Sequence, residues 1–270
     1  MTAFAGSRGR PSLTRAAAWR GLDWNHPEWW VAPLVGLAWV VVVTAAAARV
    51  IAGASAVGRP VSTLFVCPIV AGATAGGGAA WLTDLVGRTV MAIATMAWLL
   101  VPTLHHVGRT GLWARRRRGP ALVLAAYVAV WVIVVTGLDL VVGTVASVTG
   151  PAIAATLAVG VAATWQAAPR RWRAIGRCAR TVPLASRGWR ADRDCLRFGV
   201  MIGRTCVVSC SGYMLLATAT GHSLLAMVVF AVVPLRERVV RPRRPAIGLL
   251  AVMVVGLVAI LGASGFELSL

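Results

Sequence analysis

Apolar runs near the length of about 20 residues that crosses a hydrocarbon core recur along most of the chain. Hydrophobic residues make up 59% of the 270, and the mean hydropathy is +0.79. The sequence therefore predicts an all-α, polytopic helical membrane protein with about seven transmembrane helices. The predicted spans are about Val31 to Ile51, Thr89 to Val107, Ala121 to Val142, Val148 to Gln166, Gly199 to Thr218, His222 to Leu235 and Ile247 to Leu261.

Arginines between these runs predict the orientation of the chain. All 27 basic residues are arginine, against 8 acidic ones, and they cluster in segments that flank the spans. Because basic loops stay in the cytoplasm, we expect cytoplasmic loops at 108–119, 169–197 and 236–245. We also expect a basic cytoplasmic tail at 1–30, which ends in the aromatic anchor Trp24, Trp29 and Trp30. Residues 31–265 would form a single multi-pass domain in a cell membrane.

A glycine-rich stretch at 52–88 interrupts the pattern after the first span. We predict an external loop, since a crossing here would place the run Arg115 to Arg118 outside the cell. Whether 62–82 is instead a re-entrant segment or a weak span stays open.

The net charge of +19 predicts contact with anionic lipid headgroups at the arginine-rich loops. The segment 169–197, which carries Trp172 and Trp189, is expected to lie along the headgroups as an amphipathic piece. Binding to nucleic acid is not predicted, because a basic loop alone supplies no element that reads bases.

Sulfur atoms line one face of the predicted span that begins at Gly199. Cys206, Cys210 and Met214 recur every four residues, so they stack on one side of a helix. His222 and Met227 follow on the next helix, after a tight turn. Soft thiolate and thioether ligands favour Cu(I), and these five residues are the predicted metal ligands, either as one site or as a graded path. Arg204, inside the same span, is a candidate to compensate a buried thiolate.

A second interpretation of the same span needs no metal. Gly199 and Gly203 are small residues at the spacing that lets two helices approach closely, so the stripe could be a packing face. Solvation at the interface is the simplest interpretation of Asp84 and Asp139, and pairing with a cation or supplying an oxygen ligand is the alternative. Glu237 is interpreted as a local partner of its neighbouring arginines.

The chain shows no phosphate-binding glycine loop, no zinc-protease motif and no serine elbow, so enzyme activity is unsupported.

From about Val90 onward, the order of motifs resembles a bacterial family of predicted metal-binding integral membrane proteins, a domain of unknown function. The resemblance rests on Gly199-x3-Gly203-x2-Cys206-x3-Cys210-x3-Met214, then Gly221-His222, Met227 and Glu237-Arg238, with Tyr127-x3-Trp131 and Trp165-Gln166-x2-Pro169 followed by Cys178 in the middle. It implies a helical membrane fold that binds a metal. This chain lacks several of the family's sulfur ligands, since Ser209 and Ala174 stand where the family has Cys, His222 where it has Met, and Leu99-Leu100 where it has a Met pair.

The leading hypothesis is therefore a non-enzymatic membrane protein that binds or handles copper as Cu(I). One alternative is an accessory or scaffold subunit of a larger membrane complex, with no metal, packed against a partner protein or a second copy of itself. A third is a transporter.

Overall fold

The computed structural model describes residues 27–54, 78–110, 116–178, 180–185, 187–240 and 246–263. Within these ranges every regular element is a helix and there is no strand, so the predicted all-α class is confirmed. The elements are η1 (Pro27–Trp30), α2 (Val31–Ala54), α3 (Gly78–Met96), η3 (Ala97–Leu100), α4 (Val101–Thr110), α5 (Arg118–Thr149), α6 (Pro151–Ala167), α7 (Pro169–Arg177), α8 (Gly188–Ala219), α9 (Leu224–Val240) and α10 (Ala246–Ala263).

Each predicted span falls on one of these helices or on consecutive ones, and Thr89 to Val107 covers parts of α3, η3 and α4. Among the described residues, 4 segments are long and apolar enough to cross a membrane: Val31–Ala48, Trp81–Arg109, Arg118–Thr149 and Gly188–Ala219. Helices α6 and α7 together would make a fifth, although they are bent by 65° relative to each other. Ile247–Leu261 in α10 is a shorter apolar helix. The count of about seven spans stays a prediction.

The helices extend into segments predicted to be loops. Helix α3 starts at Gly78, inside the glycine-rich stretch, and α7 with the first turns of α8 occupies much of 169–197. Helix α9 continues to Val240, past the predicted end of its span. Hydropathy detects apolar helices and therefore misses a charged helix such as α7. This helix starts at Pro169, and one of its faces is buried against the core. Residues 55–77, and with them most of 62–82, lie outside the described residues.

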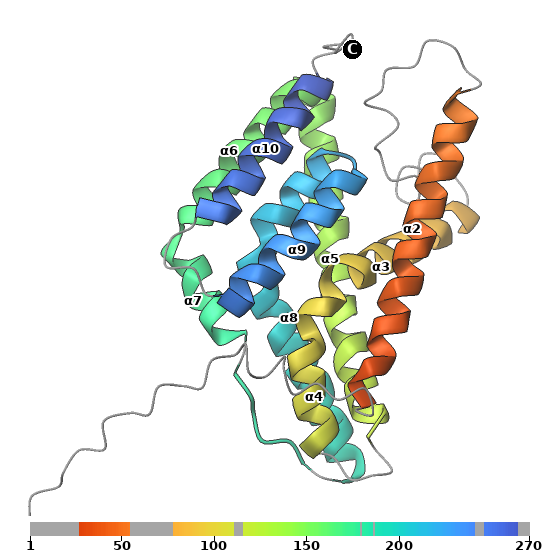
Figure 1. The fold of residues 1–270 in the computed structure, drawn as a ribbon, viewed down its shortest axis with the longest axis vertical. Helices are drawn as coiled ribbons and strands as arrows, with labels where there is room; N and C mark the ends of the chain where they lie inside the picture. The colour runs from red at the N-terminus through yellow and green to blue at the C-terminus, as the bar shows by residue number, and fades with distance from the viewer. Residues whose placement is uncertain are drawn as a thin grey trace, which may run out of the picture.

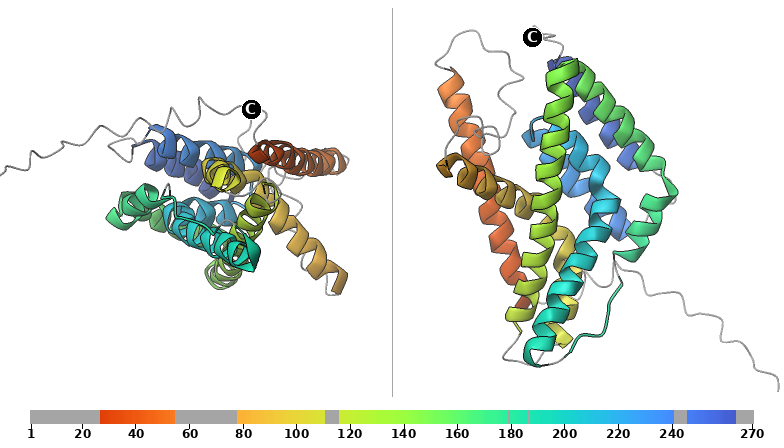
Figure 2. Two further views of the ribbon diagram at one scale, coloured as in Figure 1. Left: turned by 90° about the horizontal axis from the view of Figure 1, so that it is seen from below. Right: turned by 180° about the vertical axis from the view of Figure 1, so that it is seen from behind.

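Helices α5 and α8, each 32 residues long, lie side by side through the middle of the molecule (Figures 1 and 2). Glycines on α8 set their close approach. A Cβ added at Gly199 would lie 2.5 Å from the carbonyl oxygen of Val123 and 2.8 Å from Cβ of Ala126. One added at Gly203 would lie 3.1 Å from Cβ of Val130. The backbone of α8 therefore rests directly on α5, as small residues at a helix contact allow.

Several arginine-bearing helix segments lie toward one end of the molecule. In Figure 1 the start of α5, the first turns of α8 and helix α7 all lie in its lower half, while the connection between α5 and α6 lies at the top. The orientation of the chain in a membrane stays a prediction.

We expect Gly199→Ala to lower the melting temperature of the purified protein, because its methyl group would push α8 away from the backbone of α5. Overpacking of this kind costs about 1–3 kcal/mol. Gly137→Ala on α5 is the matched control, since a Cβ there meets nothing within 4 Å. Equal melting temperatures for the two variants would show that the α5 and α8 contact is not tight.

Candidate functional site

Cys206 and Cys210 form a buried pair of thiols on one face of α8. Their side chains are 0% and 2% exposed, and their Sγ atoms lie 3.9 Å apart. The bond from a thiolate to Zn²⁺ is about 2.3 Å long, so two sulfurs that share an ion with bonds of this length lie at most about 4.6 Å apart. The pair therefore suits a single soft ion without a large movement. Within the described ranges these two, Cys178 and Cys195 are free cysteines.

Arg238, near the end of α9, faces this pair. Its Nη2 lies 3.0 Å from Sγ of Cys206 and 3.4 Å from Sγ of Cys178, and its Nη1 donates to the carbonyl oxygen of Leu99 at 2.9 Å. A guanidinium in this position offsets the negative charge of a thiolate inside the protein. The expected candidate for that role, Arg204, is instead an exposed residue on another face of α8.

Cys178 is a third thiol at the site, and the sequence did not single it out as a ligand. It follows the last residue of α7 and is 5% exposed. The hydroxyl of Ser209 lies 3.8 Å from Sγ of Cys178 and 3.5 Å from Sγ of Cys210, so it stands between them. The signal was present in the sequence, since Arg171, Ala174 and Cys178 recur at helical spacing on one face of a basic helix. We call Cys178, Cys206 and Cys210 the thiol cluster.

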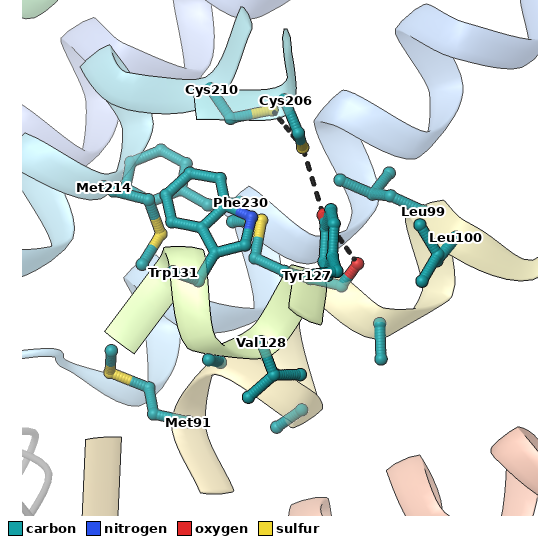
Figure 3. Packing of buried hydrophobic residues seen from close by; sticks show 14 of the residues in the cluster. Met91, Leu99, Leu100, Tyr127, Val128, Trp131, Cys206, Cys210, Met214 and Phe230 are labelled. Carbon is teal, nitrogen blue, oxygen red and sulfur yellow. Dashed lines mark hydrogen bonds between the residues drawn. The ribbon is translucent and has the colours of Figure 1, made fainter. Parts of the chain in front are cut away.

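The 3-10 turn η3, which separates α3 from α4, lies beside the thiol cluster (Figure 3). The 3-10 turn η3 brings the carbonyl oxygens of Met96 and Leu99 close to the side chains of the site. The hydroxyl of Tyr127 donates to the first at 3.2 Å and also lies 3.1 Å from Sγ of Cys206. Arg238 donates to the second. Tyr127 and Arg238 therefore connect this turn to Cys206 on α8.

The methionines lie farther along the helices than the thiol cluster and not within it. Met214 and Met227 are each 1% exposed. Figure 3 shows Met214 beside Trp131, on the side away from Tyr127, with Met91 farther along the same side. Eight residues of helix, about 12 Å, separate Met214 from Cys206. The thioethers thus line the interior beyond the thiol cluster.

His222 lies in the turn after α8, about 20 Å of helix beyond Cys206. It adopts a φ of 55°, which a non-glycine residue rarely takes. Its Nε2 lies 3.1 Å from Oδ1 of Asp139, whose Oδ2 lies 3.2 Å from Nε of Arg88. Arg88 also pairs with Asp84 at 2.9 Å. Asp84 and Asp139 are thus paired with a cation, the second of their two interpretations, in one ion network that holds His222.

Glu237 does not pair with its neighbouring arginines, so that expectation is wrong. Its carboxylate accepts hydrogen bonds from Nη2 of Arg171 on α7 and, at 3.1 Å, from the hydroxyl of Tyr213 on α8. Nε of Arg171 donates to the carbonyl oxygen of Ser209 at 3.1 Å. Arg171 is 0% and Glu237 2% exposed. This buried ion pair therefore joins α7, α8 and α9 directly beside the thiol cluster.

We expect Glu237→Gln to destabilise the protein by about 3–5 kcal/mol, because it leaves the guanidinium of Arg171 buried without a counter-charge. The double variant Arg171→Met/Glu237→Leu should recover most of that loss. Melting temperatures of the two variants test this, with Arg118→Gln as the surface control, since its pair with Asp192 is largely exposed. A single variant as stable as the control would contradict the assignment.

Comparison with known families adds an independent finding. Residues 85–262 match the family model PpoB2, described as a copper chaperone. The match covers more than half of the chain and includes the thiol cluster, the methionines and Arg238. Neither the curated proteins nor the solved structures give a match. The chain belongs to the PpoB2 copper chaperone family.

Proposed function

We propose that this chain is a non-enzymatic integral membrane protein that binds Cu(I) at Cys206 and Cys210 and passes it on. The observation that carries the proposal is the buried sulfur pair, 3.9 Å apart, with the guanidinium of Arg238 3.0 Å from one member. Membership of a copper chaperone family agrees with this chemistry.

The charges of the site suit Cu(I). Two thiolates around one Cu(I) ion carry a net negative charge, which would be costly in the protein interior without a cation nearby. Arg238 supplies that cation and also reaches Cys178. A third thiol within reach of the same guanidinium lets the ion gain a new ligand before it leaves an old one. Such an exchange suits a protein that transfers its metal rather than one that stores it.

The membrane placement follows from the long apolar helices and from the arginine-bearing ends. The side of α5, α7 and α8 that carries the arginines faces the cytoplasm in this proposal, with the N-terminal tail on the same side. The thiol cluster then lies toward the cytoplasm and His222 toward the exterior, with Met214 and Met227 between them. This order supports the graded path for a soft ion rather than one site built from all five predicted ligands.

The decisive experiment measures copper in the detergent-purified full chain after loading with Cu(I) under reducing conditions. We expect stoichiometric copper in the wild type and a loss of most of it in Cys206→Ser/Cys210→Ser. Cys195→Ser is the matched control, since Cys195 is also buried on α8 but packs near Gly119. Equal copper in all three proteins would reject the thiol site. Unchanged copper together with failed assembly of a complex would favour the scaffold subunit.

We expect Ser209→Cys to raise the affinity for Cu(I) by roughly tenfold or more, because the new sulfur would stand between Cys178 and Cys210. Competition with a Cu(I) chelator measures the change. Ser211→Cys adds a thiol to a different face of α8 and should leave the affinity unaltered. An equal gain in both variants would mean that added thiols bind copper regardless of position.

A further inference from the structure

Helix α7 presents two faces of opposite character. Arg170, Arg173 and Arg177 are spaced by three and four residues and are exposed, so they form a stripe along one side. Arg171 and Ile175 lie on the other side and are buried against the core. The exposed stripe takes no part in the ion pair or in the thiol cluster described above.

This stripe lines a hollow between α7 and α8. The cavity has a volume of about 380 Å³, and Arg204 of α8 closes it from the opposite wall. Its remaining lining is small or apolar. The lining residues are Arg170, Arg173, Ala174, Arg177, Arg204, Thr205 and Val208. We call this hollow the arginine pocket.

The charge of the arginine pocket is unbalanced. In the described part of the chain, none of its four arginines lies within salt-bridge distance of a carboxylate. Glu237, on the buried side of α7, is engaged with Arg171 instead. Four guanidinium groups that converge on one hollow repel each other unless an anion joins them.

We propose that the arginine pocket binds a phosphate group, carried by the headgroup of an anionic phospholipid. Guanidinium groups bind phosphate oxygens through paired hydrogen bonds, and basic pockets between membrane helices hold such headgroups. Ala174 and Val208 give the pocket an apolar wall that suits the attached glycerol and acyl carbons. The assignment of the phosphate group to a lipid rests on the membrane placement proposed above. The assignment of a phosphate site to the four arginines does not depend on that placement.

Native mass spectrometry of the detergent-purified full chain tests this proposal, with cardiolipin, phosphatidylglycerol and phosphatidylcholine titrated separately. We expect the two anionic lipids to bind more tightly than phosphatidylcholine, and Arg173→Gln/Arg204→Gln to weaken them by roughly tenfold or more. Arg190→Gln/Arg193→Gln removes the same charge from exposed positions at the start of α8, about 16–21 Å of helix away, and should leave binding unchanged. Arg170→Gln/Arg177→Gln serves as a second pocket variant.

A parallel arm replaces the lipid with inorganic phosphate and measures the shift in melting temperature. A shift that is lost in the pocket variants, without any preference among lipids, would support the phosphate site and assign it to free phosphate. Equal lipid affinities for the pocket and control variants, or equal affinities for anionic and zwitterionic lipids, would overturn the proposal. Copper content, measured on the same samples, should stay at the wild-type level, so failure of the pocket and failure of the copper site are distinguishable.

Discussion

The buried ion pair between Arg171 and Glu237 is the contact on which the arrangement around the thiols depends. It joins the short helix α7 to α9, and the hydroxyl of Tyr213 ties both to α8. Arg171 and Glu237 each make more than one hydrogen bond in the interior, so the three helices are joined at several points. The residue after Glu237 is Arg238, and Arg171 also binds the carbonyl of Ser209. The pair therefore sets the position of the cation and of the residues that surround the sulfur atoms.

Two polar centres lie along α8, separated by an apolar interior. The thiol cluster with Arg238 occupies one, and the network of His222, Asp139 and Arg88 occupies the other. Between them Met214 packs beside Trp131, and the ring of Phe230 lies 5.1 Å from that of Tyr213. A soft thioether is a ligand that this interior accommodates without a buried charge. The proposed path for Cu(I) thus needs no polar channel.

Most of the correct predictions from the sequence rest on the spacing of residues close together in the chain. The helical class follows from apolar length, and the proximity of Cys206 and Cys210 follows from their separation by one helical turn. Contacts between segments far apart in the sequence could not be predicted in this way. Cys178 joins the cluster, and Glu237 reaches Arg171 rather than its neighbours, only because α7 turns back against α8 and α9. Charge density suggested that α7 lies along a surface, yet its other face is buried. The pairing of His222 with Asp139 was not predicted either, because Asp139 lies on α5, far from His222 in the sequence.

The 65° bend between α6 and α7 has a mechanical consequence. The helix of 9 residues that follows the bend turns back against α8, and Cys178 directly follows its last residue. Arg177 and Cys178 are therefore neighbours in the chain, one lining the arginine pocket and the other beside Arg238. A substitution that displaces α7 would thus disturb the arginine pocket and the thiol cluster together.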